Sequence, residues 1–327
     1  MQAADPQAEQ RGSMTSPESG KAGDLSVKRK KMGVLEARRT KWGYLFIAPG
    51  IIGFLAFSLG PMLYSLFLST MEWNIITPMK FVGLKNYEEL FSNSLTWKSL
   101  QVTFLYSLIS VPLIVIVDFL VAILLNTKVK GISIFRAVFY IPSIIPLVAT
   151  CAIWMFIYNP TFGFINGILR MAHLPIMHFL DTPGTVVPSL AMIALWCSGN
   201  TVVIYLSGLQ SVPSHLYEAA KIDGASRISC FRNITVPLMT PIIFYNIVMA
   251  VISCLQTFTQ AYIMTEGGPA NGSMFLSLMI YQNAFRYSRM GYAAAVSWML
   301  FVIVGVLTAL LFASSRKWVY YETGGGQ

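Results

Sequence analysis

Long apolar stretches separated by short polar segments constrain this chain more than any other feature. The first, Tyr44–Leu68, has no charged residue over 25 positions, and about 20 apolar residues in a helix are enough to cross a bilayer. Five further stretches of similar length are predominantly apolar, with Asp118 as their one charged residue: Ser99–Leu125, Ala137–Tyr158, Thr185–Leu209, Leu238–Ile263 and Gly291–Ala313. We therefore predict an all-α integral membrane protein with six transmembrane helices.

The composition excludes an ordinary soluble globular protein. Hydrophobic residues make up 55% of the 327 residues and charged residues only 11%, and the mean hydropathy is +0.61, values far from those of soluble domains. The four cysteines show no C-x-x-C spacing, so neither a zinc site nor a disulfide framework is indicated. A net charge of +9 raises the question of a nucleic-acid partner, but the distribution of the charges favours membrane orientation instead.

The basic residues lie mainly on one side of the predicted spans. Seventeen of the 23 Lys and Arg residues fall in the N-terminal tail, the turn after the second span, the central loop and the C-terminal tail. Because cytoplasmic segments carry the excess of basic residues, both termini and the central loop are predicted to be cytoplasmic. The predicted organisation is a disordered basic tail over 1–42, a six-span domain over 43–313 and a second tail over 314–327.

The central loop, residues 209–240, carries the most specific local pattern. Ser214 and Ser226 are predicted N-caps of two short helices. Gly224 lies between them, where a helix end favours a residue that tolerates a positive φ. Pro237 is expected to end the loop before the fifth span.

Three apolar residues, Ile222, Ile228 and Phe231, stand among the charges of this loop. They are too few to form a core of their own, so they suit a pocket on another protein. Two other interpretations are a loop that folds back on its own protein and a nucleic-acid-binding helix-turn-helix. The last conflicts with the membrane-length apolar segments on both sides of the loop, so we expect no nucleic-acid partner.

The spacing of the loop resembles the EAA loop of the membrane subunits of bacterial ABC importers. Glu218-Ala219-Ala220 is followed after three residues by Gly224, and nine residues later by Ile234-x-Val236-Pro237, where Val236 replaces the usual Leu. In that family the loop is a coupling helix that docks into a groove of the ATP-hydrolysing subunit. The resemblance implies the following ATPase-coupling residues: Glu218, Ala219, Ala220, Ile222, Asp223, Gly224, Ile228 and Phe231.

Other segments look like the carbohydrate branch of these permeases. They are Phe81-Val82-Gly83-Leu84-Lys85-Asn86-Tyr87, Tyr140-Ile141-Pro142, Gly267-Gly268-Pro269 and Gly291-Tyr292-Ala293-Ala294-Ala295. The resemblance implies the type I permease fold of ABC importers, in a bacterial plasma (inner) membrane. It also implies the partners: a second homologous permease subunit, a cytoplasmic ABC ATPase dimer that binds ATP and Mg, an extracytoplasmic solute-binding protein and a sugar substrate, with the spans in the lipid bilayer.

No motif for catalysis or nucleotide binding occurs in the sequence. The P-loop spacing Gly-x4-Gly-Lys-Ser/Thr is absent, as are His-Glu-x-x-His and Gly-x-Ser-x-Gly, so nothing indicates a P-loop, a zinc protease or a serine hydrolase. We expect no catalytic residue, metal or cofactor on this chain. It is predicted to be a transport subunit rather than an enzyme, with ATP hydrolysis on a separate chain.

Polar residues inside the fourth and fifth stretches indicate a sugar path. Ser253, Gln256, Thr257 and Gln260 recur at i, i+3, i+4 and i+7, so a helix places them on one face. Sugar hydroxyls need amide and hydroxyl partners, while the C–H face of a sugar packs on aromatic rings. The predicted path residues are Trp196, Asn200, Ser253, Gln256, Thr257, Phe258 and Gln260. The alternative is that these side chains only hold helices together.

The predicted function is the permease subunit of an ATP-driven, binding-protein-dependent carbohydrate importer, with an oligosaccharide expected. Two alternatives stay open at this point. One is the import of a non-sugar solute such as a polyol phosphate. The other is an ion-coupled secondary transporter, which inverted repeats and a buried proton or sodium relay would favour; Asp118 is the only charged residue deep within the predicted stretches.

Overall fold

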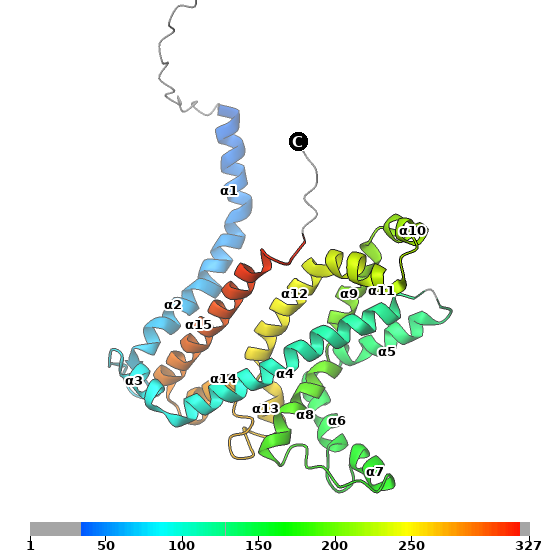
Figure 1. Ribbon diagram of the computed structural model, residues 1–327. Helices are drawn as coiled ribbons and strands as arrows, with labels where there is room; N and C mark the ends of the chain where they lie inside the picture. Colours follow the sequence, from blue (N-terminus) through cyan, green and yellow to red (C-terminus); the bar gives the residue numbers. More distant parts are fainter. Residues whose placement is uncertain (1–33, 128, 321–327) are drawn as a thin grey trace, which may run out of the picture. The chain divides into compact units, whose positions relative to one another are not determined.

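The computed structural model describes residues 34–127 and 129–320 (Figure 1). Most of the predicted N-terminal tail, up to residue 33, and residues 321–327 of the predicted C-terminal tail lie outside the described residues. The chain forms two compact units, one ending at Leu59 and one beginning at Gly60. In the first, α1 (Val34–Phe54) continues into the π-helical segment η1 (Leu55–Leu59), so the helix begins well before the predicted start at Tyr44.

The second unit opens with α2 (Gly60–Ser69), β1 (Met71–Glu72), β2 (Lys80–Phe81) and α3 (Lys85–Ser92). The two short strands pair antiparallel, with Met71 opposite Phe81. The elements that follow are α4 (Ser94–Leu125), α5 (Ile132–Ile144), α6 (Leu147–Ile157), α7 (Phe164–Met171), α8 (Pro183–Trp196), α9 (Gly199–Ser211), α10 (Ser214–Ile222), α11 (Arg227–Cys230), the π-helical η2 (Phe231–Thr235), α12 (Val236–Leu255), α13 (Thr259–Met264), α14 (Leu276–Tyr281), the π-helical η3 (Gln282–Arg286) and α15 (Met290–Ser315).

Four helical segments are long and apolar enough to cross a membrane: Trp42–Ser69, Ser94–Leu125, Arg227–Met264 and Met290–Ser315. Two bent pairs also pass that test when taken together, α5 with α6 at 102° and α8 with α9 at 49°. The described chain therefore has four candidate spans, or up to six if each bent pair is one span. The predicted all-α class is confirmed, since β1 and β2 form the only sheet among the described residues.

The predicted third span is broken rather than continuous. Pro142 lies inside α5, but Pro146 precedes α6 and Ile145 before it is extended, with ψ 131°. A proline lacks the N–H that would continue the helix, and its ring pushes the preceding residue out of the helical region. Proline chemistry thus explains the sharp bend between α5 and α6.

The predicted fifth helix differs from the structure at both ends. Helical backbone begins at Arg227 and runs through η2 into α12, so Pro237 does not end the loop as predicted. Pro237 lies in the first turn of α12, after a wider π-helical turn, where a missing N–H costs little. At the other end, Gln256, Thr257 and Phe258 interrupt the helix between α12 and α13.

The helix α4 lies at the centre of the second unit and packs against α8, α9 and α12 (Figure 1). Each half of α4 contributes one ring to a buried aromatic pair. Tyr106 meets Phe275 at 4.9 Å between ring centroids in the first half, and Phe119 meets Tyr205 at 5.2 Å in the second. Other large side chains of α4, such as Leu108, are exposed on the single chain, as expected for a helix that faces lipid or another subunit.

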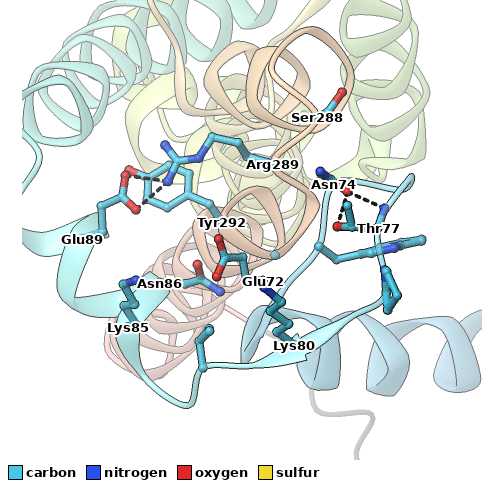
Figure 2. A pocket seen from close by; sticks show the side chains of 14 residues that line it. Glu72, Asn74, Thr77, Lys80, Lys85, Asn86, Glu89, Ser288, Arg289 and Tyr292 are labelled. Carbon is cyan, nitrogen blue, oxygen red and sulfur yellow. Dashed lines mark hydrogen bonds and ion pairs between the residues drawn. The ribbon is translucent and has the colours of Figure 1, made fainter.

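Two of the motifs quoted from the sequence meet near the start of α4. The Asn86 amide donates to the carbonyls of Ser69 and Met71 at 2.9 and 2.8 Å. Gly291 packs so closely on the Met71 carbonyl that a Cβ would overlap it. Figure 2 shows the neighbouring pocket, of about 180 Å³, where Arg289 donates to both carboxylate oxygens of Glu89 at 2.6 and 2.5 Å. These contacts fix β1 and α3 against the start of α15.

Candidate functional site

The first helix of the central loop, α10, ends at a glycine with a positive φ, as the sequence predicts. Gly224 has φ +75°, a conformation that residues with a Cβ rarely adopt. The Gly224 N–H bonds the Lys221 carbonyl at 3.2 Å, and the Ala225 N–H bonds the Ala220 carbonyl at 2.9 Å. This pair of bonds is the Schellman motif, which satisfies the last carbonyls of α10.

The two predicted N-caps have different outcomes. Ser226 caps α11, since its hydroxyl accepts from the Ser229 N–H at 3.2 Å. Ser214 is wrong as a cap: it is the first residue of α10, and Pro213 before it is the N-cap residue and makes no side-chain cap bond. Within the loop, a hydrogen bond of 2.9 Å between the hydroxyls of Tyr217 and Thr235 ties α10 to η2, just before α12.

The three apolar residues of the loop differ in how much of each side chain is exposed. Ile222 is 86% exposed and Ile228 is 78% exposed, whereas Phe231 is 36% exposed. The ring of Phe231 packs on Phe119 of α4, with the centroids 6.2 Å apart. The two isoleucines are thus free to meet another protein, while Phe231 connects the loop to α4. The other predicted coupling residues Glu218, Ala219 and Asp223 are exposed, and Ala220 is half-buried.

A cavity of about 520 Å³ lies where three helices are interrupted. Leu147 lines it just after the α5–α6 break, Cys197 and Ser198 at the α8–α9 break, and Gln256 at the α12–α13 break. Interrupted helices leave backbone groups unpaired, and in membrane transporters such backbone is tolerated where it lines a cavity. We call this space the path cavity.

The structure brings six of the seven predicted path residues to the path cavity: Asn200, Ser253, Gln256, Thr257, Phe258 and Gln260. They do not form the single helical stripe that was predicted, because the α12–α13 break falls between Ser253 and Gln260. The seventh, Trp196, lines a neighbouring cavity of about 300 Å³. Its ring meets Trp154 edge-on at 5.9 Å, so the predicted pairing of Trp196 with Asn200 on one wall is wrong.

Two further residues of the path cavity were missed from the sequence. Tyr106 donates from its hydroxyl to the Gln260 side-chain carbonyl at 3.3 Å. Asn246 is 3% exposed, and its side-chain nitrogen has no hydrogen-bond partner within the described chain. Asn246 precedes Ser253 by seven residues, so extending the predicted stripe by two helical turns would have found it. Tyr106 comes from a different span, and no local pattern indicates it.

The neighbouring cavity contains the one acidic residue within the described candidate spans. Asp118 lines it from α4 together with Trp154, Trp196 and Ser198. The Ser198 hydroxyl donates to one carboxylate oxygen of Asp118 at 2.9 Å. Because Ser198 lines both cavities, Asp118 is connected to the wall of the path cavity through a single side chain.

One of the solved structures with the same fold matches most of this chain. It is the bacterial alginate ABC transporter in complex with an alginate pentasaccharide-bound periplasmic protein. A chain of it superposes with a TM-score of 0.77 at 22% identity, covering 86% of this chain and 96% of that one. At this identity the likeness establishes the fold alone.

Two relatives found by comparison of sequences have higher sequence identity to this chain. The probable ABC transporter permease protein YesP of Bacillus subtilis (strain 168) is 43% identical over 286 residues, covering 86% of this chain and 92% of the relative. The trehalose/maltose transport system permease protein MalF of Thermococcus litoralis is 33% identical over 284 residues, covering 86% and 96%. Residues 125–320 match the family described as the binding-protein-dependent transport system inner membrane component. With these relatives and this match over more than half of its length, the chain belongs to that family of transport-system membrane components.

Proposed function

We propose that this chain is the permease subunit of an ATP-driven, binding-protein-dependent importer of a carbohydrate. The observation that carries the proposal is the path cavity, which lies at helix breaks and is lined by amides, hydroxyls and aromatic rings. The MalF relative is a permease for trehalose and maltose by its description. Membership of a binding-protein-dependent family favours this function over an ion-coupled secondary transporter.

The chemistry of the path cavity fits a sugar. Its described lining has no charged side chain, but it has four amides and several hydroxyls, with Phe258 and Tyr106 as aromatic surfaces. Each amide both donates and accepts hydrogen bonds, as does each sugar hydroxyl. A volume of about 520 Å³ is within the range of small-molecule sites. An oligosaccharide can therefore exchange its hydration shell for bonds to this wall.

The proposed topology has six spans, with each bent pair counted as one. Both termini and the central loop lie in the cytoplasm, as the basic residues indicate. A reporter fused after Lys317 and a cysteine at His215 should then both be shielded from an impermeant reagent added outside intact cells. Labelling of either position from outside would refute this orientation.

The proposed partners complete the transport cycle. A second, homologous permease contributes the other half of the path, and an extracytoplasmic binding protein delivers the sugar. A cytoplasmic ATPase dimer holds ATP and Mg and receives Ile222 and Ile228 in an apolar groove. Closure of the ATPases on ATP then moves the central loop, and Phe231 passes that movement to α4 through Phe119. This chain itself carries out no chemical step.

Uptake by proteoliposomes tests the proposed function. The chain is reconstituted with the partner permease, ATPase and binding protein of the proposed importer, and maltose, trehalose and an alginate pentasaccharide are offered as labelled sugars. We expect uptake of at least one sugar that needs ATP inside and binding protein outside. Uptake driven by a proton or sodium gradient without ATP would contradict the proposal.

A further inference from the structure

Asp118 is a buried carboxyl group that the proposed path does not use directly. It lies in the second half of α4 and is 3% exposed. One of its oxygens accepts from Ser198, and the other has no hydrogen-bond partner within the described chain. A carboxyl group inside a membrane span is costly. Among the described residues, the bond to Ser198 is the contact that compensates this cost.

Ser198 lies at the bend between α8 and α9. It is the N-cap residue of α9, and its single hydroxyl hydrogen is shared between two acceptors, the Leu195 carbonyl in the last turn of α8 at 2.5 Å and an Asp118 carboxylate oxygen at 2.9 Å. The hydroxyl therefore joins the end of one half-helix to the middle of α4. No proline stands between Trp196 and Gly199; the 49° bend lies at the Ser198-Gly199 pair, a residue combination at which helices commonly kink.

The opposite side of the bend is held by α5. A Cβ on Gly199 would collide with the backbone carbonyl of Phe139, which shows that the two backbones are in close contact. The bend is thus fixed between a backbone contact at Gly199 and a side-chain contact at Ser198. Asn200 and Thr201 follow at once in the first turn of α9, and both line the path cavity.

We propose that Asp118 is a positioning residue for the sugar path: by binding Ser198 it fixes the α8–α9 bend that presents Asn200 and Thr201 to the cavity. The inference rests on the proposed function of the path cavity. Asp118 itself lines the neighbouring cavity and not the path cavity, so it acts on the sugar through Ser198 and the bend.

Four variants test this role in the reconstituted importer. Ser198→Ala removes only the hydroxyl, Asp118→Leu removes the acceptor, Asp118→Asn keeps an oxygen acceptor without the charge, and the fourth combines Asp118→Leu with Ser198→Ala. The control is Ser107→Ala, which removes a buried hydroxyl of α4 that bonds only its own helix, at the Thr103 carbonyl. The readout is the ratio of uptake between the two best-imported sugars among maltose, trehalose and alginate pentasaccharide, beside ATPase activity stimulated by the binding protein.

We expect Ser198→Ala and Asp118→Leu each to change the uptake ratio about fivefold, the effect of one lost hydrogen bond. The double variant should change it no further, because both single variants remove the same bond. Asp118→Asn should stay within about twofold of the unchanged chain, since it keeps the acceptor. Ser107→Ala should leave the ratio unchanged, and ATPase stimulation should persist in all five variants.

A Ser198→Ala variant with an unchanged uptake ratio would overturn the proposal, even if Asp118→Leu fails to assemble. Additive effects in the double variant would overturn it too. The path cavity is judged separately by Asn200→Leu. If Asn200→Leu changes the ratio and Ser198→Ala does not, the path stands and Asp118 has no positioning role. If Asn200→Leu is also silent, the proposed path itself is wrong.

Discussion

The central loop and the path cavity are built in opposite ways. The loop takes its residues from one continuous segment, and its bonds at Gly224 and Ser226 are between near neighbours in sequence. The path cavity takes its wall from α4, the α5–α6 break, the α8–α9 break and the α12–α13 break. The loop presents apolar side chains outward, whereas the cavity gathers polar side chains inward.

This difference decides what a substitution does in each region. Ile222 and Ile228 have few contacts within this chain because most of their surface is exposed, so changing them leaves the fold intact and affects only a partner. In the cavity, Gln260 bonds Tyr106 while also facing the open space. A change there acts on the packing of the helices and on the sugar together, and needs a selectivity readout to separate the two.

The largest expected effect is on ATPase binding. Ile222→Asp places a charge where the proposed groove is apolar, and burying an unpaired charge costs several kcal/mol, so we expect the affinity for the ATPase to fall more than about a hundredfold. His215→Asp, which adds the same charge at an exposed position of the loop outside the apolar residues, is the matched control. Copurification of the tagged chain with its ATPase measures both. Normal copurification of Ile222→Asp would show that the loop is only a connection.

Substitutions at Gly224 test whether the backbone shape of the loop affects ATPase binding independently of the side chains on its surface. A Cβ at Gly224 meets nothing within 4 Å, so Gly224→Ala acts only through the strain of φ +75°, about 1–2 kcal/mol, and should weaken ATPase binding about five- to thirtyfold. Gly224→Asn should bind more tightly than Gly224→Ala because Asn tolerates this conformation better. Equal binding by both variants would mean that the turn does not limit docking.

Substitutions in the wall of the path cavity should change the selectivity of uptake among sugars. Gln256→Leu and Asn200→Leu each remove an amide from the wall, which should shift uptake among the sugars about fivefold to tenfold while the ATPase still copurifies. Ile252→Leu in α12, which does not line the cavity, is the control. If uptake and selectivity are unchanged in both amide variants, the path must lie mainly on the partner permease.

The smallest expected effect distinguishes Phe231 from the exposed isoleucines. Phe231→Leu loses the ring pair with Phe119, worth about 0.5–1.5 kcal/mol, so it should slightly lower the melting temperature of the purified chain. ATPase binding should fall much less than in Ile222→Asp. An equally severe loss of ATPase binding would place Phe231 in the docking surface itself.

The sequence was informative where interactions are local. The positive φ at Gly224 and the cap at Ser226 follow from residues within a few positions of one another, and the apolar stretches follow from composition. Pro146 could also have been recognised as a break, since it disrupts a helix by its own chemistry. The long helical run from Arg227 could not, because the π-helical turn before Pro237 has no simple residue signature.

The path cavity was predictable only as a set of residue types. The hydrogen-bonding side chains from Ser253 to Gln260 marked one wall, but nothing local indicates that Tyr106 of α4 faces Gln260. The position of Trp196 shows the same limit. A spacing of four residues predicts one face only if the helix is continuous, and here the bend at Ser198 falls between Trp196 and Asn200.

The most direct measurement compares the two regions in one preparation. Sugar uptake and ATPase activity stimulated by the binding protein are recorded together for Ile222→Asp and Gln256→Leu in proteoliposomes. The account predicts that Ile222→Asp loses stimulated ATPase activity and the uptake of every sugar in equal proportion. Gln256→Leu should keep the stimulated ATPase activity and change the ratio between sugars. Parallel loss of both activities in both variants, with no change in the ratio, would contradict the assignment of coupling to the loop and of the sugar to the cavity.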